Sequence, residues 1–393
     1  MIAANENSAK TETPSKRAVL LLAHGTPETV EEIPEYLKNV VSGRELPQAV
    51  VEEIQHRYAL IGKSPLTDWT LQQAALLQAS LNVPVYVGMR NWKPYIADTV
   101  RTMRVDGVTE AVAICLAPQN SRTSVGLYRR AAYAEAGDAL RLHFVDAWAD
   151  HPRLIEAFAE RLRIIWTQAC RETGTKIPVL FTAHSVPCRT VQTATGQTPS
   201  TADATTIASS NQAQADAAKS KVGPVRPTLP VRPTLPERSY AAPAGTPQGP
   251  DPYAVESKHT AERVAARLAA DGLAERDWYF AFQSQGASGG PWIGPSVEET
   301  LRALKEQGCA GVVLQPIGFL CDHVEILYDI DIAFQAEARK LGLKLWRPES
   351  LNASSLLIEA LADLARTGLD SLHAAPAAAT PTTAASTEFS TSA

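Results

Sequence analysis

A histidine stands where a predicted buried strand ends. The apolar run PVLFTA at 178–183 leads into His184 and Ser185, and Pro187 then breaks the extended pattern. A side chain at the carboxyl end of a parallel strand points to where α/β folds bind ligands, and imidazole suits proton transfer or metal ligation. A structural histidine would explain the position equally well. Ser185 lacks the G-x-S-x-G context of an activated nucleophile, so we do not expect it to act as one.

Ionisable side chains crowd the segment GFLCDHVEILYDID, which follows another apolar run, GVVLQPI. They are Asp322, His323, Glu325, Asp329 and Asp331. Such groups at the end of a buried strand are costly unless they are solvated or used. If a helix begins near residue 323, Glu325 and Asp329 share one face, and a passing cation would relieve their repulsion. The alternative is a solvated helix start, where carboxylates favour the helix dipole.

A third set of polar side chains lies in RYALIGKSPL at 57–66, where Arg57, Tyr58 and Ser64 surround a turn at Gly62. Arginine can bind a carboxylate through two hydrogen bonds, and hydroxyl groups can add more. A purely structural role is also open. The segment matches neither a Walker A loop nor a dinucleotide fingerprint, which disfavours a phosphate-dependent enzyme.

Two sets of short apolar runs would position these residues. Each set alternates with amphipathic, helix-like stretches, which predicts parallel sheets covered by helices. The strands are expected at 17–22, 83–88, 111–117, 141–145, 178–183, 277–283, 311–317 and 343–346. The helices are expected near 68–82, 95–106, 254–272, 296–307, 325–340 and 353–367. The fold class is therefore α/β, with two similar lobes and a ligand cleft between them.

Composition narrows the functional classes. The 393 residues suffice for two domains, and a net charge of −5 with a pI near 6.0 argues against nucleic acid as a partner. The five cysteines contain no CxxC pair, so we interpret them as reduced structural thiols. The chain has neither a signal-peptide pattern nor an apolar run long enough for an integral membrane segment. We therefore expect a cytoplasmic protein.

Low-complexity sequence interrupts the second lobe. Between Thr190 and Asp251 the chain is rich in Thr, Ala, Ser, Gln and Pro, with a tandem VRPTLP at 225–236. Such sequence cannot bury a core, which predicts a disordered insertion at 191–250; a Pro-rich docking site is the alternative. The expected organisation is a disordered N-terminus at 1–16, lobes at 17–165 and 175–350, a C-terminal helix at 351–370 and a disordered tail at 371–393.

Six motifs together carry a family resemblance. In chain order they are LLAHGTPE (21–28), RYALIGKSPL (57–66), LAPQNSRTSVGLY (116–128), FTAHSVP (181–187), FQSQGASGGPWIGP (282–295) and GFLCDHVEILYDID (318–331). Their order and spacing are similar to those of bacterial-type ferrochelatases, over nearly the whole chain outside the insertion and tails. The resemblance implies two Rossmann-like lobes and insertion of Fe2+ into coproporphyrin III or protoporphyrin IX, in haem biosynthesis.

The resemblance implies that His184 and Glu325 are catalytic metal-binding residues on opposite walls of the porphyrin cleft. Two pyrrole protons must leave while the hydrated dication sheds water. A neutral imidazole can accept a proton or ligate iron, and a carboxylate can balance charge. Which residue does which is left open. Bending of the porphyrin would expose its nitrogen lone pairs.

The resemblance also implies porphyrin-binding residues. Arg57, Tyr58, Ser64 and Tyr128 match positions that hold porphyrin carboxylates, and Trp292 is expected against the macrocycle. His24 departs from relatives that carry an iron-ligating tyrosine at this position. Imidazole is a good axial ligand for haem iron, so His24 is expected to hold the metallated product, with a hydrogen bond to the GTP turn as the alternative.

Asp329 matches an acidic position that the family has been proposed to use for guiding metal or removing protons. The next position on that face is Ala333 rather than an acid, so either Asp331 substitutes for it or the path is shorter. Asp322 and His323 are expected to support the loop that carries Glu325, and a direct role of His323 is left open.

The resemblance implies a monomer that requires no cofactor, because Fe2+ is a substrate. The cysteine cluster that holds the iron–sulfur centre of mitochondrial members is absent, as is their apolar lip. Porphyrin and Fe2+ are the expected small-molecule partners, and haem-pathway proteins would bind only transiently. Competing hypotheses are a cobalt or nickel chelatase for a related tetrapyrrole and a non-catalytic haem or porphyrin carrier.

Overall fold

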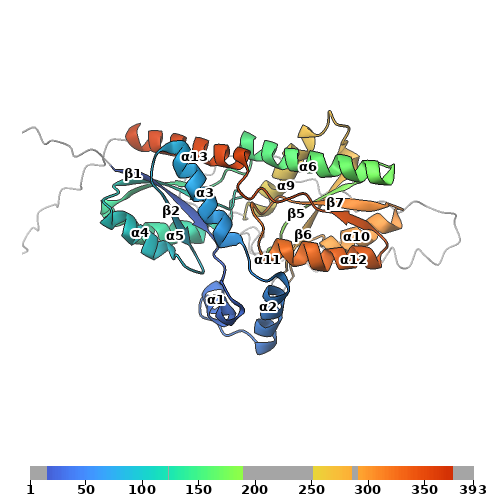
Figure 1. The fold of residues 1–393 in the computed structure, drawn as a ribbon, viewed down its shortest axis with the longest axis horizontal. Coiled ribbons are helices and arrows are strands. Elements are labelled where there is room, and N and C mark those ends of the chain that lie inside the picture. The colour runs from blue at the N-terminus through green and yellow to red at the C-terminus, as the bar shows by residue number, and fades with distance from the viewer. Residues whose placement is uncertain (1–15, 123, 189–250, 286–290, 375–393) are drawn as a thin grey trace, which may run out of the picture.

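The computed structural model describes residues 16–122, 124–188, 251–285 and 291–374, which form two α/β lobes side by side (Figure 1). The insertion predicted at 191–250 lies outside the described residues, as do nearly all of the N-terminal segment and most of the tail. No helix in the described ranges is both long and apolar enough to cross a membrane.

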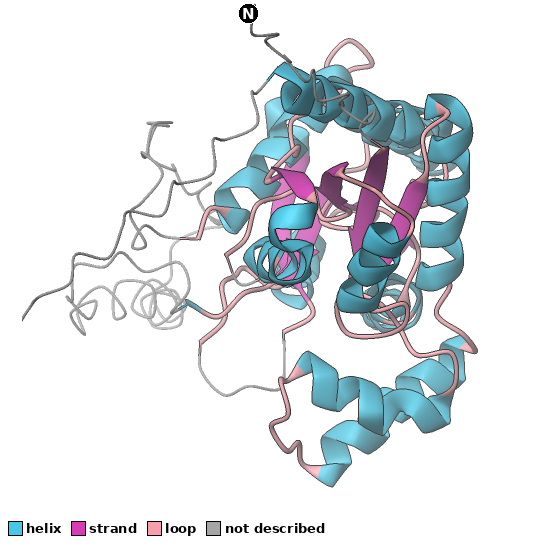
Figure 2. Cartoon of the chain, turned by 90° about the vertical axis from the view of Figure 1, so that its left-hand side faces the viewer, coloured by secondary structure: helices cyan, strands magenta, loops and turns pink. Residues whose placement is uncertain are grey.

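The first lobe is built on a parallel sheet in the order β2 (Val85–Met89), β1 (Arg17–Ala23), β3 (Glu110–Cys115) and β4 (Arg141–Val145). Both faces of β1 are buried: Leu20 and Leu22 pack on one side and Val19 and Leu21 on the other. This explains why the strand reads as a continuous apolar run rather than an alternating one. Helices α4 (Ile96–Val105) and α5 (Val125–Ala136) cover one face, and α3 (Leu66–Leu81) lies on the other (Figures 1 and 2).

The second lobe repeats this arrangement. Its parallel sheet has the order β6 (Trp278–Gln283), β5 (Val179–His184), β7 (Gly311–Pro316) and β8 (Lys344–Trp346). Helices α6 (Pro152–Thr173) and α9 (Tyr253–Arg267) lie on one side, and α10 (Val297–Glu306) and α12 (Gln335–Lys340) on the other (Figure 1). The predicted fold class is confirmed. Short 3-10 turns occur at η1 (Val30–Glu32), η2 (Gly137–Ala139) and η3 (Glu275–Asp277).

The C-terminal helix α13 (Ser355–Ala374) returns to the first lobe. It packs on α3, β3, β4 and α6, and Gly368 lets it approach Val112 so closely that an added Cβ would lie 2.7 Å from that side chain. Burial of Leu369 and Leu372 extends the helix beyond residue 370, where the sequence placed the start of a tail. The helix therefore completes the core of the first lobe.

Two features lie near the cleft: a pair of projecting helices, and a helix that is divided into three segments. Helices α1 (Ile33–Val40) and α2 (Gln48–Ile61) project below both lobes and share an apolar cluster that Val324 also contacts (Figure 1). The single helix expected at 325–340 is instead α11 (Val324–Leu327), a π-helical segment η4 (Asp329–Phe334) and α12. A π-turn changes the spacing of side chains on the helix face, and such turns are frequent at functional sites.

Candidate active site

His184 and Glu325 meet at one edge of the second sheet. His184 is the last residue of β5, and Glu325 lies in α11, which follows the neighbouring strand β7. The Nε2 atom of His184 is 3.4 Å from Oε1 of Glu325. Because parallel strands end at the same sheet edge, the two side chains contact each other directly. The expectation that they occupy opposite walls is wrong, since both belong to the second lobe.

The contact sets the protonation of both groups. Burial alone would lower the pKa of His184, but the carboxylate of Glu325 outweighs it and raises that pKa to about 9. Burial favours the neutral form of Glu325, yet His184 and His323 hold the pKa of Glu325 well below its usual range. At neutral pH the resting pair is therefore imidazolium and carboxylate, so His184 must lose its proton before it can act as a neutral imidazole.

His323 and Asp322 fix the loop that carries Glu325. Nε2 of His323 is 3.6 Å from Oε2 of Glu325, and its Nδ1 contacts the carbonyl oxygen of Cys321 at 3.0 Å. Asp322 accepts hydrogen bonds from Ser350 at 2.7 Å and from the amide of Asn352 at 3.1 Å. These contacts tie both residues to the segment that carries Glu325, and their supporting role in catalysis stays a prediction.

A cavity of about 380 Å³ opens in front of the pair, and both lobes line it. Eight of the residues singled out in the sequence lie on its wall: His24, Tyr58, Ser64, Tyr128, His184, Trp292, His323 and Glu325. The Ser64 hydroxyl is buried and has no hydrogen-bond partner among the described residues, whereas the Tyr58 hydroxyl lies 2.9 Å from that of Thr26. Ser64 therefore retains a donor for a ligand.

Arg57 and Asp329 contact each other and are not among the described residues that line the cavity. Nη1 of Arg57 is 3.6 Å from Oδ1 of Asp329, and the hydroxyl of Ser284 donates to Oδ2 of the same carboxylate. Burial and the charge of Glu325 raise the pKa of Asp329 to about 6, while Ser284 and Arg57 act in the opposite direction. The charge of Glu325 thus affects the protonation of Asp329, which is consistent with the two carboxylates lying near each other.

Asp331 does not extend this acidic row. Both of its carboxylate oxygens are held by Arg347, at 2.6 Å and 2.8 Å, and Arg347 also contacts Asp322 at 3.3 Å. Substitution of Asp331 for the missing acid at Ala333 is therefore contradicted, because its charge is already balanced within the second lobe. The other alternative, a shorter path that ends at Asp329, stays a prediction.

His24 faces the pair from the first lobe. It follows β1, its ring packs edge-on against Tyr36 with centroids 6.2 Å apart, and the side-chain nitrogen of Asn91 lies 3.0 Å from its Nε2. Within the described residues the ring bonds to Asn91 and not to the GTP turn. Burial, followed by the charge of Arg90, lowers the pKa of His24 to about 3, so its imidazole is neutral.

Sequence reasoning missed Tyr253 and Arg90 on the cavity wall, and Asn91 and Ser284, which bond to His24 and Asp329. Tyr253, which accepts a 3.1 Å hydrogen bond from the backbone N–H of His184, follows the low-complexity insertion and carries no motif signal. Arg90 and Asn91 directly follow β2 and are separated by one residue from the strand predicted at 83–88, and that position was the available signal. Ser284 lies inside a quoted motif but has a common residue type.

Two parallel sheets with a histidine–carboxylate pair in the cavity between them define a chelatase-type α/β protein. The fold is similar to that of SirB from Bacillus subtilis solved with Fe3+, with a TM-score of 0.50 and 10% identity over 91% of this chain and 97% of that one. This likeness concerns the fold alone. Within the described residues, no three His, Cys, Asp or Glu side chains are arranged to hold a metal ion by themselves.

The sequence comparisons identify the family. The ferrochelatase family model matches residues 16–369. A ferrochelatase from Acidobacterium capsulatum is 56% identical, covering 92% of this chain and 97% of the relative. A coproporphyrin III ferrochelatase from a Geobacillus species is 30% identical, covering 88% and 96%. The chain belongs to the ferrochelatase family, which confirms the resemblance found in its motifs.

Proposed function

We propose that this enzyme inserts Fe2+ into a porphyrin bound in the cavity between the lobes, with His184 and Glu325 at the reacting nitrogens. The observation that carries the assignment of these residues is their 3.4 Å contact on the wall of a cavity large enough to admit part of a flat macrocycle. Because the porphyrin supplies four nitrogen ligands, the protein needs only to deliver the cation and remove protons. Family membership and the names of the relatives favour iron insertion over the cobalt, nickel and carrier hypotheses.

The resting protonation suggests an order of events. His184 already carries a proton at neutral pH, so the first pyrrole proton passes to the carboxylate of Glu325. Glu325 passes this proton through Asp329 to solvent and is again a carboxylate. An approaching dication then repels the imidazolium proton of His184, which leaves by the same route through Glu325, so that neutral His184 can ligate the metal or accept the second pyrrole proton. Whenever it is deprotonated, Glu325 lies as a carboxylate beside His184 and His323 and can balance the charge of the incoming cation.

Asp329 extends the acidic path one step behind Glu325. Its carboxylate lies against Ser284 and Arg57, and no acid follows at Ala333. In this proposal Asp329 receives the hydrated cation or the departing proton and exchanges it with Glu325. The path therefore contains a single carboxylate beyond the catalytic pair.

His24 holds the metallated product from the opposite wall. Its imidazole is neutral and lines the cavity, which are the two conditions that an axial nitrogen ligand must meet. Tyr128, Ser64 and Trp292 complete the porphyrin site, with hydroxyl donors for carboxylates and an aromatic ring for the macrocycle. The enzyme needs no resident cofactor in this scheme, works as a cytoplasmic monomer and takes Fe2+ as a substrate.

An anaerobic metalation assay tests the proposal. The purified protein is mixed with coproporphyrin III or protoporphyrin IX and with Fe2+, Co2+ or Ni2+, and the absorption spectrum is followed. We expect Fe2+ insertion well above the protein-free rate. Porphyrin binding without any metalation would support a carrier instead, and preference for Co2+ or Ni2+ at matched free concentrations would support the other chelatase class.

A further inference from the structure

Arg90 presents unused hydrogen-bond donors at the cavity. It follows β2, beside the end of β1 that carries His24, and it lies on the cavity wall. Its Nε donates to Oδ1 of Asn91 at 3.3 Å, and its guanidinium lies 5.2 Å from the ring centre of Tyr128. Its Nη1 is shielded from solvent and meets no acceptor among the described residues.

No carboxylate of the described residues pairs with this guanidinium, which sets it apart from other arginines near the site. Arg57 pairs with Asp329, and Arg347 is held by both oxygens of Asp331. Among the described residues that line the cavity, the only carboxylate belongs to Glu325, which His184 and His323 already hold. A partly buried cation without a counterion is unfavourable, so the complementary anion has to come with the ligand.

The surroundings of Arg90 restrict that anion to a planar, carboxylate-like group on an aromatic ligand. Guanidinium binds carboxylates through two parallel hydrogen bonds, and the two terminal nitrogens of Arg90 are not used by any described acceptor. Tyr128 and His24 flank the site and provide flat apolar surface next to the charge. A porphyrin propionate that points into the cavity meets both requirements.

We propose that Arg90 binds an inward-pointing propionate of the porphyrin and thereby selects a tetrapropionate substrate of the coproporphyrin III type over porphyrins with apolar groups at that position. The inference rests on the proposed function, because it needs a porphyrin in this cavity. Neutral substituents would leave the guanidinium buried and unpaired, and this penalty would weaken their binding even where the ring itself fits.

A comparison of two porphyrins tests the role of Arg90. Mesoporphyrin IX carries ethyl groups where coproporphyrin III carries two of its propionates, and binding of each is measured by fluorescence titration without metal. For Arg90→Met we expect coproporphyrin III to bind about tenfold to a hundredfold more weakly, the range for loss of a charge-assisted hydrogen bond, with mesoporphyrin IX nearly unchanged. Arg90→Lys should retain part of the preference, because it keeps the charge but loses the fork.

Arg129→Met is the matched control, since Arg129 also lies over a tyrosine ring, that of Tyr133 at 5.7 Å, but pairs with Asp146 on the surface. It should leave both affinities unchanged. The proposal would be overturned if Arg90→Met weakened the binding of both porphyrins equally. It would also be overturned if a folded Arg90→Met or Arg90→Lys protein bound coproporphyrin III with unchanged affinity. If the unmodified enzyme binds neither porphyrin, the proposed function itself fails, a result distinct from loss of selectivity.

Discussion

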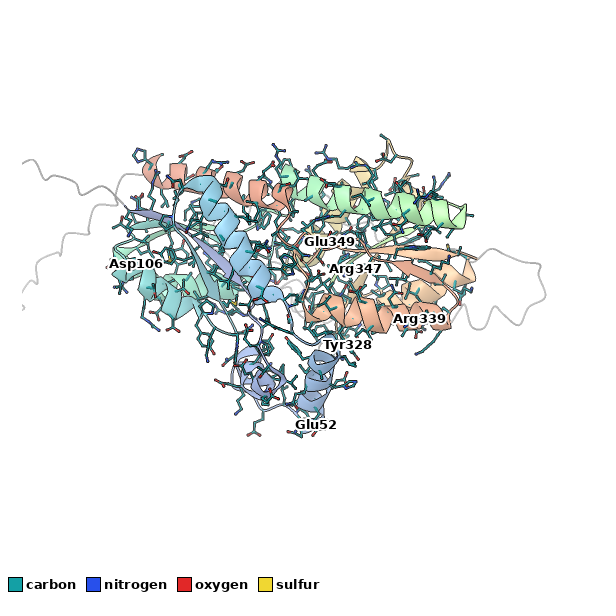
Figure 3. The ribbon with its side chains drawn as sticks, in the orientation of Figure 1. Glu52, Asp106, Tyr328, Arg339, Arg347 and Glu349 are labelled. Atoms are coloured by element: carbon teal, nitrogen blue, oxygen red, sulfur yellow. The ribbon has the colours of Figure 1, made fainter. Side chains whose placement is uncertain are left out.

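Arg57 in α2 pairs with Asp329 at the start of η4, with 3.6 Å between Nη1 and Oδ1. Its guanidinium also lies 4.9 Å from the ring centre of Tyr328, and its Nε is 2.9 Å from Glu53. Figure 3 marks Tyr328 where the projecting helices reach the second lobe. Arg57, which the resemblance places at a porphyrin carboxylate, thus contacts the carboxylate of Asp329 and is not among the described residues that line the cavity.

Removing the positive charge of Arg57 should shift the pH dependence of the metalation rate to higher pH. Arg57 lowers the pKa of Asp329, which stands at about 6, so in Arg57→Met that pKa should rise. Asp329 then stays protonated to higher pH, and the metalation rate at saturating porphyrin should fall between pH 6 and 7 and recover toward pH 8. Rate profiles from pH 5.5 to 8.5 measure the shift. An unshifted profile would remove Asp329 from the path, and Arg153→Met, at an exposed ion pair, is the control.

Glu325 has the largest effect in raising the pKa of His184, and the backbone of Ser185 and the charge of Asp329 act in the same direction. In Glu325→Gln the largest influence that raises the pKa of His184 is lost while its burial remains, so the pKa should fall from about 9. Titration of the imidazole resonances by NMR, assigned with His184→Ala, measures both values. A pKa of His184 that stays near 9 in Glu325→Gln would show that Glu325 does not control it.

Removing the imidazole of His184 should lower the metalation rate without weakening porphyrin binding. We expect His184→Ala to reduce the metalation rate at least about a hundredfold, the usual scale for an acid–base group, while porphyrin affinity measured by fluorescence changes little. His56→Ala, on the exposed side of α2, should leave both quantities unchanged. Turnover that survives in His184→Ala would exclude His184 from the mechanism.

The sequence predicted the two lobes well because β1, β3, β5 and β7 are buried on both faces and read as apolar runs. It also placed His184 at the end of its strand, which is a local property. The contact between His184 and Glu325 depends on β5 and β7 being neighbours in a sheet, and a spacing of 141 residues carries no such information. Before the structure, only the resemblance of the ordered motifs to the family indicated that the two residues belong to one site.

Other features depend on tertiary contacts that residue types do not specify. Two acidic residues of the π-helical segment η4 form ion pairs with arginines from other parts of the chain: Asp329 with Arg57, and Asp331 with Arg347. Neither arginine adjoins this segment in the chain, so a regular helix was the reasonable expectation. Arg90 was missed for a similar reason: a lone arginine after a strand is common, and its unused donors become apparent only when its neighbours are known.

Removal of 191–250 should leave catalysis intact. Every residue assigned to the site lies outside this range, and a shortened loop costs little free energy when its ends can still meet. The deletion retains Asp251, which accepts hydrogen bonds from the Ser121 hydroxyl and from the backbone N–H of Arg122. We expect kcat/KM for metalation within about twofold of the full chain. A strong loss with an unchanged melting temperature would show that the segment acts in the reaction.

Arg347 should contribute more to stability than the surface arginines. Figure 3 shows it between α12 and the long upper helices, with 14% of its side chain exposed. It binds Asp331 through two nitrogens and also contacts Asp322, so Arg347→Met leaves two carboxylates partly buried without a cation. We expect the free energy of unfolding to fall by about 3 kcal/mol, the lower end of the range for breaking a buried pair, because Asp331 is one-third exposed.

Urea unfolding of a double-mutant cycle measures this coupling. Asp331→Asn combined with Arg347→Met should be more stable than the sum of the single changes predicts, because the second substitution removes a charge that the first left unpaired. Arg366→Met is the control: Arg366 and Asp363 are both about half exposed, and this pair should contribute within about 0.5 kcal/mol. Strictly additive effects of the two substitutions would mean that Asp331 is not held by Arg347 and remains available to extend the acidic path beyond Asp329.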